Sequence, residues 1–447
     1  MDIILNILQA ILVFIPAILI LVLVHEFGHF ITAKLFGMKV ERFSIGFPPR
    51  VAGKKVGDTD YCISATPLGG YVKISGMLDE NMDVEQLKQE PKPWEFRSKP
   101  VWQRSIVISA GVIFNMILAV VIYASMAFTY GEEVIPPENV DGIYVEQSSV
   151  AEEVGFETGD KIVAVNGKTV DSFMKFFSPA EITESGLTYT VVRDGQRRQI
   201  DIPENVLDRI NEDGFISLVN IAPSLIGQVK DGSPAARAGL EAGDRIVEVD
   251  GEPVNYWLQL TDKIEAADGP LNLTVARDGE RISKQLTPDP ETQTIGVYLA
   301  NLREYFDTRK IEYNPITAIG EGINKSKETA VGIVQGLGKL LSGSISVKDN
   351  LGGPVAIASV TKQVTEQHGI RGFWEITAFL SVTLAIMNIL PIPVLDGGHL
   401  VFLIYEGVTR REPSMRVRMV LQQIGFILLI GLIIFVTFND ILRNLGY

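Results

Sequence analysis

The most regular pattern in the chain is a set of four long apolar segments, at about residues 3–24, 105–128, 376–404 and 420–438. A helix rises about 1.5 Å per residue, so each segment can cross a hydrocarbon core of roughly 30 Å. The first segment has no basic residues before it and no small-residue cleavage site after it, which favours a retained membrane helix over a signal peptide. The pattern therefore predicts a multi-pass α-helical membrane protein with four transmembrane helices.

The loops between these segments differ in charge. Basic residues gather near the segment ends in the loop at 34–104 and in the short loop after the third segment: Lys34, Lys39, Arg42, Arg50, Lys54, Lys55, Arg97, Lys99, Arg104, Arg410, Arg411, Arg416 and Arg418. Cytoplasmic loops of membrane proteins carry such an excess of Lys and Arg. We therefore expect both loops to be cytoplasmic, with residues 131–312 and both termini on the outer, periplasmic side.

The block at 131–312 is acidic, with 34 Asp and Glu against 17 Lys and Arg, a net charge of −17. The rest of the chain holds 20 acidic and 23 basic residues. This balance argues against nucleic acid as a partner, because phosphate binding needs clustered Lys and Arg. The single cysteine, Cys62, excludes an intrachain disulfide and a Cys-rich metal site.

The acidic block contains an internal repeat. Residues 155–167 recur as 239–251, and the Arg-Asp-Gly at Arg193 recurs at Arg277, always 84 residues later. Each copy reads as a short helix, a Gly-Asp turn, a strand, an Asn-Gly or Asp-Gly turn, a helix and a hairpin. The copies resemble tandem bacterial PDZ domains, which are α+β, and 232–240 is similar to the helix-opening signature of that family. We place the first domain at 131–213 and the second at 214–300.

Two roles are open for such a pair. PDZ domains capture peptide ends by adding a strand beside backbone amides, and in the second copy we expect that loop near 223–229. The first copy has no comparable loop. Alternatively, two rigid lobes over a membrane site would exclude bulky substrates without binding any peptide, and the sequence favours this second role.

Residues 301–370 form a linker between the acidic block and the last membrane segments. Apolar residues recur there at intervals of three and four: Ile316, Ile319, Ile323, Ala330, Ile333, Val334, Leu337, Leu340 and Leu341. This spacing predicts an amphipathic helix that lies in the membrane interface or packs on protein. Gly352 and Gly353 then interrupt it, and Pro354 can open a further helix. The membrane core comprises residues 1–130 and 371–447.

The first apolar segment ends in His25-Glu26-Phe27-Gly28-His29. On a helix, residues four apart share a face, so His25 and His29 can present two imidazoles to one Zn²⁺ while Glu26 activates water. A charge at bilayer depth costs about 2.5–3.5 kcal/mol, so this placement calls for a function. The motif indicates a metalloprotease centre inside the membrane.

A catalytic zinc site normally has three protein ligands. Pro391 and Pro393 break the third apolar segment, and broken backbone in a bilayer is tolerated only in a protein interior or beside a wet cavity. We therefore expect this segment to face the two histidines. Asp396 and His399, three residues apart on one helix, could each supply the third ligand.

The combination of H-E-x-x-H in the first helix with Leu395-Asp396-Gly397 in a later one resembles the site-2 protease family. Two PDZ-like copies between the second and third helices are similar to its regulator-of-sigma-E branch, and the likeness covers nearly the whole chain. The resemblance implies that His25, His29 and Asp396 bind zinc, that Glu26 is the catalytic base and that Asn388 helps to hold the substrate strand. His399 then becomes a residue that supports the ligands or the fold.

Two further stretches resemble this family. Residues 61–74 read as strand, Gly-rich turn and strand, similar to its membrane-associated β-hairpin, which implies that Gly69, Gly70 and Tyr71 bind an unwound substrate. An ordinary cytoplasmic hairpin would leave the same pattern. Gly111 and Asn115 resemble the G-x-x-x-N of its second core helix, where Asn115 either supports the site or joins two helices.

The sequence thus predicts a zinc-dependent intramembrane endopeptidase of an inner membrane, with its site near the cytoplasmic face. Its partners would be the lipid bilayer, single-pass membrane substrates and a peptide ligand of the second PDZ domain. The resemblance implies a pre-trimmed anti-sigma factor and remnant signal peptides as substrates, in an envelope stress response. Two other classes compete: a membrane scaffold with a vestigial metal site, and a transporter, since broken helices and buried charges also mark ion pathways.

Overall fold

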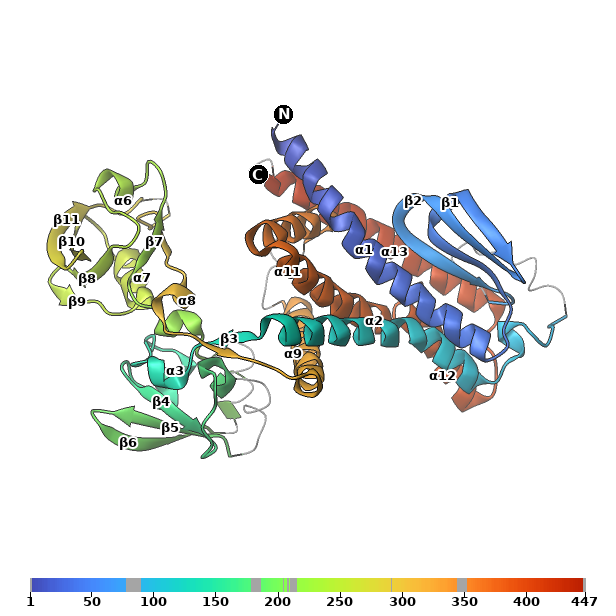
Figure 1. Ribbon diagram of the computed structural model, residues 1–447, viewed down its shortest axis with the longest axis horizontal. Coiled ribbons are helices and arrows are strands. Elements are labelled where there is room, and N and C mark those ends of the chain that lie inside the picture. The colour runs from blue at the N-terminus through green and yellow to red at the C-terminus, as the bar shows by residue number, and fades with distance from the viewer. Residues whose placement is uncertain are drawn as a thin grey trace. The chain divides into compact units, whose positions relative to one another are not determined.

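The computed structural model describes residues 2–77, 90–177, 186–203, 205–206, 209, 215–290, 292–343 and 352–444. Two compact units make up the chain, and each is coloured along its sequence in Figure 1. We call Met1–Tyr130 with Glu312–Tyr447 the membrane unit, and Gly131–Ile311 the acidic unit.

Within the described residues, the membrane unit contains four helices long and apolar enough to span a bilayer. They are α1 Asp2–Leu35, α2 Val101–Tyr130, α11 Pro354–Ile389 and α13 Met415–Asn444. The prediction of four spanning helices is confirmed. Mean hydropathy in the best windows reaches 2.7 in α1 and 2.5 in α2 and α13, which suits direct contact with lipid.

The predicted third helix, at about 376–404, is wrong in its bounds. Its helix α11 begins already at Pro354, which suits a first helical turn because proline needs no N–H partner there. It ends at Ile389 because Pro391 disfavours a helical conformation at Leu390. A separate helix, α12, covers Asp396–Thr409. Gly369, with φ 61° and ψ −144°, also interrupts α11.

The predicted amphipathic helix is confirmed as α9, Pro315–Ser342. Small residues form much of its contact with the protein: Ala318, Gly322 and Ser326 are buried, and a Cβ on Gly322 would lie 2.8 Å from the backbone nitrogen of Ala124 in α2. The large apolar side chains at its two ends point away, with Ile316 82% exposed and Leu341 89% exposed. Helices in membranes often meet through such small residues.

The predicted hairpin within 61–74 is wrong, because these residues form one continuous strand. This strand, β2 Thr59–Ile74, pairs along both halves with β1 Val40–Val56. Arg42 of β1 faces Asp60 on one side and Lys73 on the other. The segments therefore lie in the order 50–56, 59–64, 40–45 and 70–74. Among the described residues, no further strand pairs with 70–74, so this segment is an edge.

The acidic unit repeats its elements about 84 residues apart. The paired helices are α3 Val150–Glu153 and α6 Pro234–Arg237; the paired strands are β4 Lys161–Val165 and β8 Arg245–Val249, β5 Thr188–Arg193 and β10 Leu271–Arg277, and β6 Gln196–Asp201 and β11 Glu280–Leu286. The first sheet has the order β4-β5-β6 and the second β11-β10-β8-β9, with β9 at Glu252–Pro253. The second copy has its expected helix, α7 Trp257–Glu265. In the first, a 3₁₀ helix covers Phe173–Phe177 and the rest of the expected helix lies outside the described residues.

Each copy has its own hydrophobic core. We call the copy built around the first core the first lobe, and the copy built around the second core the second lobe. Ile216 and Ile221 pack into the first core, beyond the boundary placed at 213. That boundary lies outside the described residues, and the division into two PDZ domains stays a prediction. Shorter elements complete the unit: β3 Glu132–Val134, a 3₁₀ helix at Pro137–Asn139, another at Leu218–Ile221, β7 Ile226–Val229, β12 Val297–Leu299, α8 Leu302–Tyr305 and β13 Arg309–Ile311.

Candidate metal centre

Three predicted site residues converge inside the membrane unit. His25 and His29, one turn apart on α1, are 8% and 9% exposed. Their Nε2 atoms lie 3.2 Å apart. Asp396, the first residue of α12, brings its Oδ2 to 3.2 Å from His25 Nε2 and 3.5 Å from His29 Nε2. Within the described part of the chain, these three residues form the group suited to a metal ion.

The geometry of this group fits zinc. Ligand atoms about 2.0–2.1 Å from one tetrahedral ion lie about 3.3–3.4 Å from one another. The three observed separations, 3.2, 3.2 and 3.5 Å, scatter closely around that value. Asp396 Oδ2 is also buried without a hydrogen-bond partner. Since a buried carboxylate oxygen in that state is costly, the site calls for a cation.

The remaining ring nitrogens hold the imidazoles in place. His29 Nδ1–H donates to the carbonyl oxygen of Val107 in α2, at 2.8 Å. His25 Nδ1 lies 3.3 Å from the side-chain amide of Asn115, whose Oδ1 is buried without a partner. Turning that amide by 180° lets Oδ1 accept from His25 Nδ1–H. Both Nε2 atoms are then free to bind a metal, as is usual for ligating histidines.

Two glycines let α1 and α2 approach closely enough for these contacts. A Cβ on Gly111 would lie 2.6 Å from His29 Nε2 and 2.7 Å from His25 Nε2. A Cβ on Gly28 would lie 2.5 Å from the carbonyl oxygen of Ala110. Any larger residue at these positions must push the imidazoles or the helices apart. The sequence marked Gly111 only by a motif, and Gly28 and the carbonyl of Val107 not at all.

Asp396 reaches the histidines because the chain breaks before it. In the break, Val394 adopts φ 96°, which is strained for a β-branched residue and costs about 1–3 kcal/mol. Gly397 and Gly398 then allow a tight return, since a Cβ on Gly397 would lie 2.2 Å from the carbonyl oxygen of Leu390. The prediction that this segment faces the histidine pair is confirmed.

His399 lies apart from this group. Its Nε2 is 3.3 Å from the side-chain nitrogen of Gln422 in α13. Spacing alone left Asp396 and His399 as alternatives, and the structure brings only Asp396 to His25 and His29 among the described residues.

The edge segment at 70–74 passes beside the predicted catalytic base. A Cβ on Gly70 would lie 3.7 Å from Glu26 Cγ. The neighbouring Gly69 packs on the ring of Phe47, and that ring stacks on Tyr71 with centroids 6.5 Å apart. The three residues predicted to bind substrate thus lie on one strand, and Gly70 of that strand lies beside Glu26.

Asn388 lies in the last turn of α11, just before the break, and is half-buried. Among the hydrogen bonds of the described residues, none joins it to the metal group. Its predicted role in holding substrate stays a prediction.

Known proteins resemble this chain over almost its whole length. The model of peptidase family M50 matches residues 13–432. The regulator of sigma-E protease of Escherichia coli is 35% identical over 454 residues, covering 96% of this chain and 98% of that protein. That of Haemophilus influenzae is 34% identical over 448 residues, with the same coverage. A protein of Neisseria meningitidis whose name describes a zinc metalloprotease is 33% identical over 457 residues, covering 98% of this chain and 100% of its own. The chain therefore belongs to peptidase family M50, as a membrane zinc metalloprotease of the site-2, regulator-of-sigma-E type.

Proposed function

We propose that the enzyme cuts the transmembrane segments of single-pass membrane proteins, with His25, His29 and Asp396 as zinc ligands and Glu26 as the general base. The observation that carries this proposal is that Asp396 converges with two buried histidines of a helix long and apolar enough to span a bilayer. The buried Asp396 Oδ2 without a partner argues against a vestigial site. In the described residues the four spanning helices also lack an internal repeat, which makes a transporter a poor fit.

Zinc, when bound, supplies a Lewis acid that polarises the scissile carbonyl and lowers the pKa of water toward about 7. The chain's own residues transfer the proton and orient the imidazoles. Glu26 accepts the proton of the attacking water on its carboxylate and passes it to the leaving amine nitrogen. Val107 and Asn115 hold the imidazoles so that both Nε2 atoms face one point.

The substrate must lose its helical hydrogen bonds before it can be cut, since a helix hides its peptide bonds. The edge at 70–74 can replace these bonds by pairing with the unwound strand. Gly70 lies beside Glu26, so a strand added there would run past the catalytic base. In this proposal Gly69, Gly70 and Tyr71 bind the substrate backbone and Asn388 holds its far side.

The same proposal includes the enzyme's orientation. The basic residues where α1 ends and α2 begins support an orientation with the metal centre near the cytoplasmic face of an inner membrane and the acidic unit in the periplasm. The outward apolar side of α9, including Ile316 and Leu341, would lie against lipid. By analogy with the regulator-of-sigma-E proteases, we propose a pre-trimmed anti-sigma factor and remnant signal peptides as substrates.

Changing Glu26 to Gln tests the catalytic assignment. The amide keeps the shape of the side chain but cannot accept a proton, so cleavage of a model transmembrane substrate should fall at least about 100-fold, with zinc content unchanged. Glu366→Gln is the matched control, because that carboxylate is 65% exposed on α11 and pairs with Lys362. Near-normal cleavage by Glu26→Gln would remove Glu26 from the mechanism.

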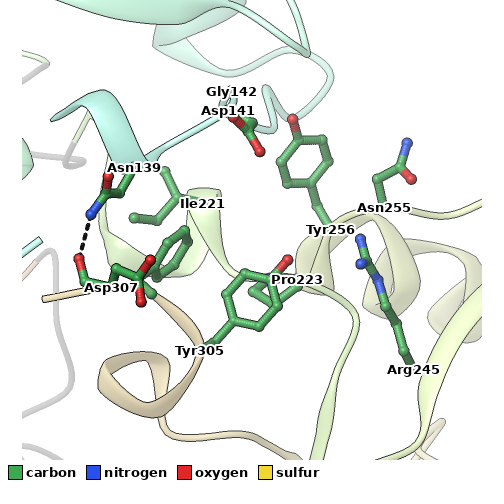
Figure 2. Close-up of a pocket in the computed structure, with 11 residues that line it drawn as sticks. Asn139, Asp141, Gly142, Ile221, Pro223, Arg245, Asn255, Tyr256, Tyr305 and Asp307 are labelled. Carbon is green, nitrogen blue, oxygen red and sulfur yellow. Dashed lines mark hydrogen bonds between the residues drawn. The ribbon is translucent and has the colours of Figure 1, made fainter. Parts of the chain in front are cut away.

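For the acidic unit we propose steric exclusion of substrates with bulky outer domains, with peptide capture as the second candidate. Two features favour capture. Strand β12 of the second lobe pairs only with β7 among the described residues, which leaves an edge. A cavity of about 490 Å³ also lies between the lobes (Figure 2), where Arg245 carries a buried Nε without a hydrogen-bond partner.

A deletion separates the two roles. Val134 of β3 lies opposite Arg309 of β13 in an antiparallel pair, so residues 135–308 can be replaced by a two-residue Asn-Gly turn. Every proposed catalytic residue lies outside this segment. Exclusion predicts that the shortened enzyme cuts untrimmed substrates as well as trimmed ones. Loss of cleavage of trimmed substrates, in a folded and zinc-loaded protein, would instead make the lobes a required binding module.

A further inference from the structure

We infer that Arg104 and Glu406 form a positioning pair, which fixes α12 against α2 and thereby sets the position of Asp396 relative to the two histidines. This inference rests on the proposed function, because it takes Asp396 to be a zinc ligand. Neither residue touches the metal group, so both would act through the helices that carry it.

The geometry of the pair is restrictive. Arg104 Nη2 donates to Glu406 Oε1 at 2.5 Å, and Nη1 donates to Oε2 at 3.1 Å. The two side chains are 6% and 11% exposed. A bidentate contact between two planar groups fixes both distance and angle, which a single hydrogen bond or an apolar contact does not. The guanidinium carbon also lies 6.0 Å from the ring centroid of Phe96, which limits its movement further.

The pair joins the two halves of the metal centre. Helix α2 holds both histidines, through Val107 and Asn115. Arg104 lies on the same helix, one turn before Val107. Helix α12 carries Asp396 at its start and Glu406 ten residues later. Helix α2 therefore fixes both parts of the site. It holds the two imidazoles through hydrogen bonds and holds α12, with Asp396, through this ion pair.

Helix α12 needs such a restraint. The irregular residues 390–395, with two prolines, separate it from α11, so no continuous helix determines its rotation or height. Leu403 packs with Val107 and Ile108, but apolar contacts alone permit sliding, and lipid provides no hydrophobic force between helices. A cavity of about 270 Å³, lined partly by Arg104, His399 and Glu406, leaves one flank of α12 incompletely packed. Buried ion pairs contribute little net stability, and their best-attested role is to fix register.

The test measures zinc affinity of the full-length protein in detergent by competition with a chelator. Loss of a residue that is hydrogen-bonded to a metal ligand typically weakens metal binding 10- to 100-fold. Arg104 and Glu406 act one step further from the metal, so we expect Glu406→Gln and Arg104→Gln to weaken zinc binding by about 10-fold, at the lower end of that range. The exchanged pair, Arg104→Glu with Glu406→Arg, should recover at least part of the affinity. Arg104→Lys keeps the charge without the bidentate geometry and should lie in between, which provides a milder variant if the others fail to fold.

A matched control lies beside the same cavity. Arg97 pairs with Glu95 at 2.7 Å with similar burial, but the two residues are close neighbours along the chain. Arg97→Gln should keep wild-type zinc affinity. The melting temperature of the metal-free protein separates positioning from stability, because a positioning role weakens zinc binding more than it lowers that temperature.

Measuring Asp396→Asn in parallel distinguishes failure of the proposed zinc ligands from failure of the positioning role. Full zinc affinity in Asp396→Asn would overturn the proposed ligand set itself. If Asp396→Asn loses zinc while Glu406→Gln and Arg104→Lys both keep it, only the positioning role is wrong. Equal losses in Glu406→Gln and Arg97→Gln, or no recovery in the exchanged pair, would likewise overturn it.

Discussion

Three carboxylates largely shielded from solvent, Asp160 and Asp244 in the acidic unit and Asp396 in the membrane unit, have opposite surroundings. In the acidic unit, Asp160 and Asp244 are both 0% exposed. Each receives two hydrogen bonds from an arginine, Asp160 from Arg193 at 2.7 Å and Asp244 from Arg277 at 2.6 and 2.8 Å. Each also accepts one from a backbone N–H at 2.9 Å. In the membrane unit, Asp396 lies beside the imidazoles of His25 and His29, and its Oδ2 has no hydrogen-bond partner among the described residues.

This difference distinguishes a carboxylate that stabilises the fold from one that is suited to bind a cation. A carboxylate with a fixed guanidinium is already neutralised and holds the Gly-Asp turn of its lobe, which explains why the same arrangement occurs twice, 84 residues apart. A carboxylate beside two acceptor nitrogens is not neutralised by the protein. Such a site is complete only with a cation that the chain does not supply.

The largest expected effect comes from removing the charge of Asp396. Asp396→Asn should weaken zinc binding at least about 100-fold and abolish cleavage, because a carboxylate oxygen is lost from the three ligands. His399→Ala, on the same helix, should keep most of the zinc. Metal content of the two purified variants decides between them, and full zinc in Asp396→Asn with loss in His399→Ala would reverse the assignment.

The corresponding change in the acidic unit should affect folding and leave the metal centre intact. Arg277→Met leaves Asp244 buried without its cation, which should destabilise the second lobe. Arg281→Met is the control, because its pair with Glu248 is at the surface, with Arg281 71% exposed, and is worth less than about 1 kcal/mol. Hydrogen exchange in β8, β10 and β11 measures the effect. Zinc loss in Arg277→Met would contradict the separation between the two units.

Lowering the pH should have a smaller effect, on the stability of the second lobe. Burial raises the pKa of Asp244, but hydrogen bonds from Arg277 and from the backbone of Glu241, together with the arginine's charge, outweigh it and hold the pKa below its usual 3.8. A lowered folded pKa contributes stability that is present above the unfolded pKa of about 3.9 and is lost as pH falls through the folded value. Exchange protection in the second lobe should therefore decline below about pH 4. In Asp244→Asn this part of the decline should be missing; an unchanged pH profile would exclude Asp244 as its source.

Much of the membrane unit could be predicted because its signals are local. Segment length and hydropathy predicted four spanning helices, and the four-residue spacing of His25 and His29 predicted a shared face. The repeat was equally visible because identical turns recur at one offset. The third helix was placed poorly, because its N-terminal half carries charged residues such as Lys362, Glu366 and Arg371 and the prolines that end it lie inside the apolar run.

The sheet formed by β1 and β2 has a pairing that local sequence patterns do not predict. The sequence of 61–74 alternates like a hairpin, yet both of its halves pair with β1, since Gly69 lets the strand pass directly over Phe47 instead of turning back. The residues of β1 that pair with this strand lie earlier in the chain, and they leave no mark in the alternation of the strand itself.

The sequence by itself indicated a zinc-binding group, four segments long and apolar enough to cross a membrane and a repeat in the acidic block, because spacing, apolar length and repetition are properties of the chain. Only the tertiary structure brought Asp396, and not His399, beside the two histidines, made 70–74 an edge strand segment, and joined Val107, Gly111 and Asn115 to the histidines. These outcomes depend on close approaches between backbones and on carbonyl groups that every residue has. No side-chain pattern can encode such contacts before the helices pack.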